Sequence, residues 1–141
     1  MNYILTTLAF FIGVLLPVQV GVNAELARHI NSSVLAALVS FLVGGMCLIL
    51  GAAVFKAPLP TFAQVVSLPA WLWGGGLIGA LVVLGSIVAG PKIGALALVS
   101  LLLAGQLVAS ILIDHYGWLG FNIQKMDFQR MLGVLLLVGG V

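Results

Sequence analysis

Residues 93–113 read "IGALALVSLLLAGQLVASILI", an apolar run that contains no charged side chain. A helix needs about 20 predominantly apolar residues to cross a bilayer, so this run is long enough to span one. Its most strongly polar side chain is Gln106, which lies roughly 5 Å from the middle of the run at the rise of an α-helix. The stretch therefore predicts a spanning helix that carries an amide near the centre of the membrane.

The composition extends this interpretation to the whole chain. Of 141 residues, 63% are apolar and 6% are charged, whereas about a quarter of the residues in a soluble domain are charged. The chain is therefore predicted to be a membrane protein. Its net charge of +2 comes from five basic and three acidic residues. These charges are spread singly along the chain, which is too sparse for a nucleic-acid partner.

The residue patterns that indicate catalysis or metal binding are missing from the sequence. Cys47 is the single cysteine and lies inside an apolar run, so the sequence contains neither a disulfide framework nor a ligand cluster. It also contains no recognisable phosphate-binding loop and no nucleophile with an adjacent base. We therefore expect no metal, no cofactor and no enzymatic activity.

Three further runs have the length of a membrane span, at residues 3–22, 34–55 and 71–90. A fifth run, at 131–141, is shorter by several residues. We predict an all-α, polytopic bundle of five transmembrane helices that forms one domain over residues 1–141. An alternative count of four treats the last run as a helix on the membrane surface.

The first run has an alternative interpretation as a secretory signal, because residues 22–24 have the small side chains of a cleavage site. No positive charge precedes the run, however, and it is longer than the roughly 7 to 15 apolar residues usual for such signals. An uncleaved first span is therefore the preferred interpretation.

The basic residues of the loops are almost evenly divided between the two sides of the membrane. With these spans, Lys56, Lys125 and Arg130 share one side, whereas Arg28 and Lys92 lie on the other. Because the bias of Lys and Arg orients a membrane protein, three against two specifies orientation only weakly. We predict insertion in both directions, so that two identical copies form an antiparallel homodimer. The alternative is a single orientation that a small bias is enough to set.

Polar side chains within the spans are the candidate substrate-binding residues. Gln19 and Asn23 are four residues apart and share a helix face, and Gln106, Ser110 and Asp114 form a similar row. Such groups are unfavourable in lipid unless they face a bundle interior or a watery cavity. We expect the first row of one copy to face the second row of an inverted copy. The alternative is a structural hydrogen bond between helices, worth about 1 kcal/mol.

Pro17 and two carboxylates complete the set of candidates. Pro17 removes a helix hydrogen bond to the carbonyl of Gly13, which frees an acceptor near Gln19 and permits a kink. A packing kink without a role in binding is the alternative. Glu25 and Asp114 are the carboxylates nearest the spans, so they are candidates for proton coupling. The alternative interpretation is that both carboxylates are ordinary charges at the membrane interface.

Small residues at four-residue spacing indicate where helices approach closely in lipid. Three such rows occur, at Ala36, Ser40 and Gly44, at Gly75 and Gly79, and at Gly105 and Ala109. Together they predict a tight bundle. Trp71, Trp73 and Trp118 lie at the ends of predicted spans, where tryptophan anchors a helix at the membrane interface.

Two stretches carry a resemblance to a known family, "AGPKIGAL" at 89–96 and "GQLVASILIDHYG" at 105–117. With most of the remaining chain, they resemble the YdcZ-like family of small bacterial inner-membrane proteins, placed in the drug/metabolite transporter superfamily. The resemblance implies a five-helix half-transporter, equivalent to one inverted-repeat unit, that works as oppositely oriented copies or as fused pairs. Related small multidrug resistance proteins have an essential glutamate within the first span. Residues 3–22 contain no acid, so their proton-coupled mechanism is not expected here.

The sequence therefore predicts a transporter subunit of the bacterial inner membrane, with lipid as its surroundings and a small polar or amphipathic metabolite or drug as its substrate. An ion or solute channel is the first alternative, and it would need a continuous pore. A membrane assembly or stress protein that transports nothing is the second.

Overall fold

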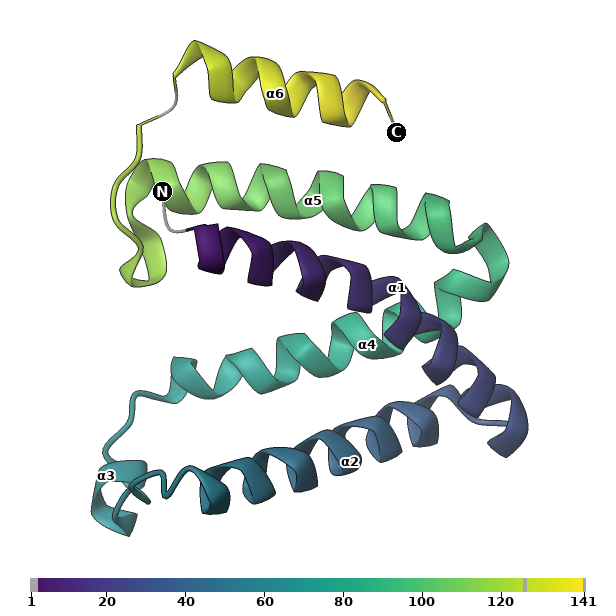
Figure 1. Cartoon of the computed structure of the whole chain (residues 1–141), viewed down its shortest axis with the longest axis vertical. Helices are drawn as coiled ribbons and strands as arrows, with labels where there is room; N and C mark the ends of the chain where they lie inside the picture. Colours follow the sequence, from purple (N-terminus) through teal and green to yellow (C-terminus); the bar gives the residue numbers. More distant parts are fainter. Residues whose placement is uncertain (1–2, 126, 141) are drawn as a thin grey trace. The chain divides into compact units, whose positions relative to one another are not determined.

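The computed structural model describes residues 3–125 and 127–140, and every regular element in this part of the chain is a helix. The prediction of an all-α fold is thus confirmed (Figure 1). In chain order, the elements are α1 (Tyr3–Ile30), α2 (Ser33–Val54), α3 (Phe62–Val66), η1 (Ala70–Trp73), α4 (Gly74–Ile93), α5 (Ala95–Tyr116), η2 (Trp118–Gly120) and α6 (Phe128–Gly139).

Four helical segments of the described chain are long and apolar enough to cross a membrane. They correspond to the first four predicted spans and cover Tyr3–Ile30, Ser33–Val54, Ala70–Ile93 and Ala95–Tyr116. The predicted fifth span corresponds to α6, which has 12 residues. At the rise of an α-helix this is about 18 Å, compared with about 30 Å for the hydrocarbon core. The count of five spans is therefore not confirmed.

Helix α1 continues well beyond the predicted end of the first span at residue 22. Its last two turns contain Ala, Glu, Leu and Arg, which are strong helix formers. The side chains of Glu25 and Arg28, three residues apart, form an ion pair along the helix surface. The helix ends at Ile30, and Asn31 then adopts a left-handed conformation with φ 51°.

The turn between α1 and α2 consists of only Asn31 and Ser32. Ser32 is the N-cap of α2, and its Oγ accepts a hydrogen bond of 3.2 Å from the backbone N–H of Leu35. The backbone N–H of Ser32 also donates to the carbonyl of Ala27 at 3.2 Å. These bonds define a tight helical hairpin.

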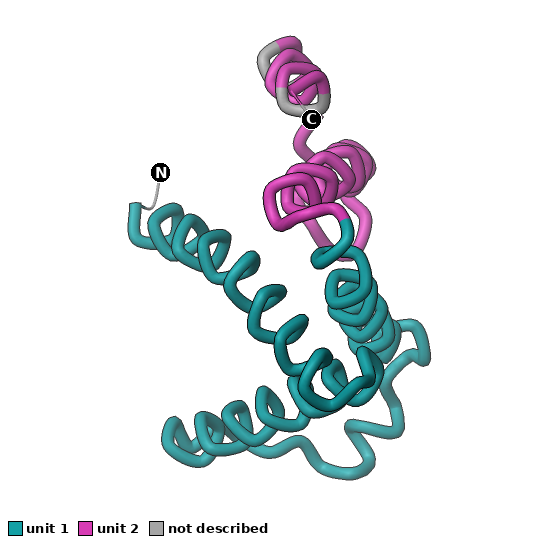
Figure 2. The backbone as a smooth tube through the Cα atoms, turned by 90° about the vertical axis from the view of Figure 1, so that its right-hand side faces the viewer, with its two compact units in different colours: residues 1–92 teal, residues 93–141 magenta. Residues whose placement is uncertain are grey.

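The chain divides into two compact units, residues 1–92 and 93–141, which Figure 2 colours separately. The first unit contains a small core at the α1–α2 turn, made by Ala36, Ala37 and Ile87. Leu26 and Ala27 of α1 and Val83 and Leu84 of α4 pack against it. The prediction that residues 1–141 form one domain stays a prediction.

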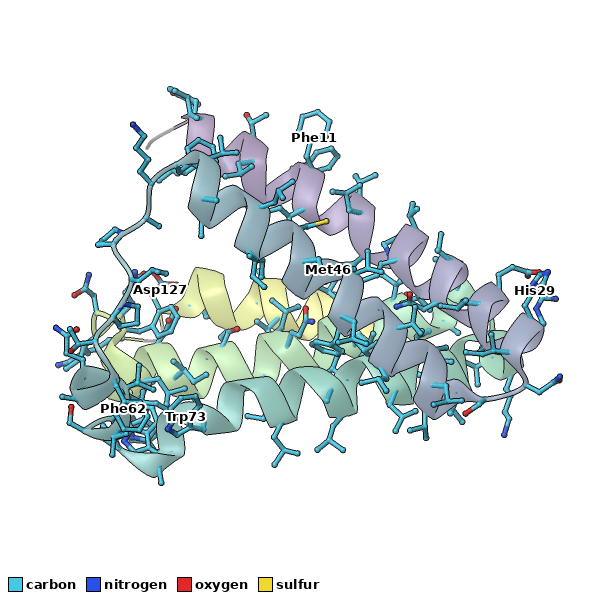
Figure 3. The ribbon with its side chains drawn as sticks, turned by 90° about the horizontal axis from the view of Figure 1, so that it is seen from below. Phe11, His29, Met46, Phe62, Trp73 and Asp127 are labelled. Atoms are coloured by element: carbon cyan, nitrogen blue, oxygen red, sulfur yellow. The ribbon has the colours of Figure 1, made fainter. Side chains whose placement is uncertain are left out.

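Away from this core, α1 and α2 diverge. Figures 1 and 2 both show the two helices meeting at their turn and separating toward the start of α1. Residues 3–16 are all exposed. Phe11 of α1, which points away from the ribbon in Figure 3, and Met46 of α2 are exposed as well. Within the first unit, close packing of α1 and α2 is therefore confined to their turn, and a tight bundle of all spans stays a prediction.

The rows of small residues have unequal surroundings. Ala36 is completely buried, and a methyl group added to Gly79 of α4 would lie 3.6 Å from the Phe41 ring of α2. Methyl groups added to Gly44, Gly75 or Gly105 would have no neighbour within 4 Å. Close approach at these last three glycines stays a prediction.

In the second unit, the residues after α5 fold back onto its end. Gly117 caps α5 in a left-handed conformation with φ 64°, and the backbone N–H of Gln124 donates to the carbonyl of Asp114 at 2.9 Å. The rings of Tyr116 and Trp118 stack, with centroids 5.0 Å apart. This places an aromatic pair at the end of the fourth span, as expected for an interfacial anchor.

Candidate functional site

The two polar residues predicted on one face of α1 lie in different surroundings. Asn23 is buried, with 6% of its surface exposed, whereas Gln19 one turn earlier is exposed. Asn23 is one turn from Leu26 and Ala27, which pack against the core at the α1–α2 turn. Gln19 precedes this packed region. A single copy therefore buries one member of the row and leaves the other uncovered.

Pro17 lies inside α1, which continues through it without a break. Because proline has no N–H, the carbonyl of Gly13 loses its partner within the helix. Figure 1 shows that α1 changes direction between its two halves. Both halves are helical, so the free carbonyl lies on a bent helix and not in a loop.

Gln106 and Ser110 are exposed on α5, and Asp114 is partly buried near the end of the same helix. The three residues are spaced one turn apart, so they form the predicted row along α5. The amide of Gln106 thus lies on an apolar helix surface that the second unit does not cover. The expectation that this row faces Gln19 of an inverted copy stays a prediction.

Glu25 belongs to a network of charges at the end of α1. Its carboxylate forms an ion pair with the guanidinium of Arg28 and lies 3.4 Å from Nδ1 of His29. The same Nδ1 is 3.0 Å from the carbonyl oxygen of Glu25. The exposed pair of Glu25 with Arg28 is worth about 0.3 to 0.5 kcal/mol. The arrangement supports the interpretation of Glu25 as an interfacial charge.

A cavity of about 450 Å³ lies in the first unit where α1 ends, α2 begins and α4 ends. Its polar lining comes from the α1–α2 turn and from the last turn of α4. The residues that matter for its chemistry are Arg28, Asn31, Ser32, Ser33, Pro91 and Lys92. Its two cationic residues are 64 positions apart in the sequence, and none of the six was predicted as part of a site.

The cavity has an apolar part and a polar part. Ile87 and Val88 line it one turn deeper along α4 than Pro91 and Lys92. Pro91 lies in the last turn of α4 and cannot donate a backbone hydrogen bond to the carbonyl of Ile87. The lining thus changes from aliphatic to cationic toward the end of the helix.

Among the described residues, no group of three or more His, Cys, Asp or Glu side chains is placed to hold a metal ion. The chemistry available to the polar residues is therefore hydrogen bonding through amides and hydroxyls, together with the charges at the helix ends.

Comparisons with known proteins give two matches. The family model described as "Putative inner membrane exporter, YdcZ" matches residues 4–141. Inner membrane protein YdcZ of Escherichia coli K12 is 31% identical over 138 residues, covering 95% of this chain and 91% of that protein. No solved structure matches.

Proposed function

Since the chain belongs to the YdcZ family of inner-membrane proteins, we propose that it is a subunit of a transporter that carries a small polar or amphipathic solute out of the cell. The resemblance found in the sequence is confirmed by the family match. A multi-pass location in the inner membrane is confirmed by the relative and by the four apolar helices.

The exposed amides carry this proposal. Gln19 and Gln106 lie on helices that are long and apolar enough to cross the membrane, and a single copy leaves both uncovered. An amide facing lipid is unfavourable, so each requires a protein neighbour or a watery cavity. Gln19 is exposed on α1, so a neighbour can contact it there. A second copy supplies it without any further component.

The charges favour an inverted second copy. Arg28 and Lys92 lie on one side of the membrane, and Lys56 and Lys125 lie on the other. This division needs only the four helices that are long and apolar enough to cross the membrane. It does not depend on α6, because Lys125 precedes α6 and residue 130 lies in its first turn. Three basic residues against two give a weak orientation bias, so both orientations are accessible.

In the proposed dimer, each half contains one polar row from each chain. Gln19 of one copy faces Gln106 and Ser110 of the other, and the carbonyl of Gly13 freed by Pro17 lies close to them. Amides and hydroxyls offer both donors and acceptors, which suits an uncharged polar group or a mixed polar and apolar solute. Two inverted copies then reproduce the inverted-repeat arrangement of secondary transporters.

Flux into proteoliposomes tests the transporter. A panel of labelled solutes, with set proton and ion gradients, should show saturable uptake for the true substrate class. Gln19→Leu and Gln106→Leu should each reduce this flux by at least about tenfold while the dimer survives. The exposed neighbours Val18→Leu and Val108→Leu are matched controls and should transport normally. Flux that never saturates would identify a channel, and no flux with any solute would favour a non-transporting protein.

Crosslinking tests the contact between rows. After Cys47 is replaced by Ala, cysteines at positions 19 and 110 should form a disulfide between chains, visible as a dimer on a non-reducing gel. Cysteines at 18 and 108 are the control pair. Strong crosslinking of the control pair, or of 19 to 110 only within a monomer, would contradict the inverted arrangement.

The proposal also bears on coupling. If a carboxylate carries the coupling proton, Glu25→Gln and Asp114→Asn should each abolish accumulation of substrate against its gradient. Exchange of substrate across the membrane should remain measurable in both variants. Glu25→Gln also removes the ion pair with Arg28, so Arg28→Gln is the control for loss of the pair alone. If both carboxylate variants still concentrate substrate, side-chain carboxylates are excluded from coupling.

A further inference from the structure

We propose that the cavity at the α1–α2 turn binds a phosphate group, carried either by an anionic phospholipid headgroup or by a soluble phosphorylated solute. This site is separate from the proposed transport pathway, because none of Gln19, Gln106 and Ser110 lines it. Binding is measured without transport, so the two proposals can fail independently.

The charge of the lining is the first argument. The cavity is lined by two cationic residues, Arg28 and Lys92, and by no acidic one. Arg28 is paired with Glu25, but a guanidinium has five N–H donors, and one carboxylate does not use them all. The Glu25 carboxylate offsets the charge of Arg28, so the open cavity keeps one net positive charge, that of Lys92, which favours an anion.

Hydrogen-bond donors reinforce this potential. Asn31, Ser32 and Ser33 line the same cavity, and their side chains can donate to phosphate oxygens. Ser33 is also the first residue of α2, a helix of 22 residues. The N–H groups of a first helical turn lack partners within the helix and carry the positive end of its dipole. The N–H of Leu35 is taken by the Ser32 side chain, so the N–H groups of Ser33 and Val34 are those that remain. Charge and donors therefore meet in one place.

The position and size of the cavity are the second argument. Arg28 and Lys92 are the basic residues that end the apolar runs of α1 and α4, so they lie at the depth of lipid headgroups. A volume of about 450 Å³ is within the range of small-ligand sites. Ile87 and Val88 form an aliphatic wall one turn deeper in the membrane than Lys92. A phospholipid would place its headgroup at Lys92 and its acyl chains against this wall.

A simpler role for the cations makes a different prediction. Arg28 and Lys92 each occupy the last turn of a helix, where a positive charge complements the helix dipole. That role needs no ligand and is the same in any lipid. Phosphate binding, in contrast, makes the stability of the protein depend on a specific anion and on Lys92.

The test uses the full chain purified in a neutral detergent. Its thermal unfolding is followed by tryptophan fluorescence while one of three probes is added: dioctanoyl phosphatidylglycerol, dioctanoyl phosphatidylcholine or sn-glycerol 3-phosphate. Phosphatidylglycerol should raise the unfolding midpoint saturably and more than phosphatidylcholine does. Lys92→Gln should weaken its apparent affinity about tenfold, as expected for the loss of one charge-assisted bond, whereas Lys92→Arg should retain it.

Lys56→Gln is the matched control, because Lys56 is a loop lysine of the same unit that does not line the cavity. It should leave the affinity unchanged. Protection by glycerol 3-phosphate as well as by the lipid identifies the phosphate alone as the ligand, and protection by the lipid only identifies a headgroup site. Equal protection by both lipids, or equal weakening by Lys56→Gln and Lys92→Gln, overturns the proposal.

Discussion

The two ends of the first unit are built in opposite ways. At the end that contains His29, a two-residue turn joins α1 to α2, and Ala36 is completely buried. At the other end, a longer connection with the short elements α3 and η1 separates α2 from α4, and Phe62 and Trp73 are exposed. Figure 3 shows His29 at one end of this unit and Phe62 and Trp73 at the other.

The difference shows what holds helices together in a membrane. Helices α1 and α2 are apolar along most of their length, yet only one end of the pair is packed. Lipid is as apolar as leucine, so apolar character alone gives no drive for association. Close contact arises where small side chains such as Ala36 and Ala37 let backbones approach and where a short turn keeps the helices adjacent.

The largest expected effect comes from filling the packed end. Ala36→Leu forces three extra carbons into a site with no exposed surface, and overpacking of this kind costs about 1 to 3 kcal/mol. Unfolding by SDS titration in mixed micelles should show a correspondingly lower midpoint. Ala53→Leu, at the exposed end of α2, is the control and should change little. Equal losses at both positions would remove the contrast between the ends.

A smaller effect is expected from the helix caps. Ser32→Ala removes the bond from Leu35 at the start of α2 and should lower stability by about 1 kcal/mol. Thr61→Ala removes the capping box of α3, a helix of five residues. It should raise hydrogen exchange in α3 without changing the global midpoint. A global loss from Thr61→Ala would show that the loop end contributes to folding as much as the turn does.

The smallest effect concerns α4. Gly79→Ala adds a methyl group at ordinary contact distance, 3.6 Å, from the Phe41 ring, and alanine is favoured over glycine within a helix by roughly 0.5 to 1 kcal/mol. We expect a stabilisation of about 0.5 kcal/mol in the same SDS titration. Gly75→Ala, which meets nothing within 4 Å and lies in the first turn, should give less. Destabilisation at Gly79 would mean that α2 and α4 are closer than their contact indicates.

The sequence predicted the positions of the spans better than their ends. The second span was predicted at 34–55 and α2 covers Ser33–Val54, because an uninterrupted apolar run coincides with a helix. The first span was expected to stop at residue 22, but helix propensity and the Glu25–Arg28 pair carry α1 to Ile30. Polarity indicates where a helix leaves the lipid, which is not where the helix ends.

The cavity could not be predicted in the same way. Arg28 and Lys92 are far apart in sequence, and although Lys92 lies in the stretch 89–96 that resembles the family, the resemblance assigns it no role. Only the packing of α4 against the α1–α2 hairpin makes them neighbours across one cavity. The sequence contains one usable signal. Arg28 and Lys92 each end an apolar run, and both lie on the same predicted side of the membrane. The polar rows did not predict burial, because Asn23 and Gln19 share a helix face but Asn23 is buried and Gln19 is exposed.

The short turn at Asn31 and Ser32 also has a consequence for the order of assembly. Leu26 and Ala27 meet the cluster that contains Ala36 within about ten residues of chain, whereas Ile87 joins it 51 positions after Ala36. Contacts between near neighbours form fastest, and membrane chains are folded as they are synthesised. The α1–α2 hairpin can therefore close once α2 has left the ribosome. The wall of the cavity that bears Lys92 arrives later, so Arg28 stands open to the surrounding lipid until α4 has been made.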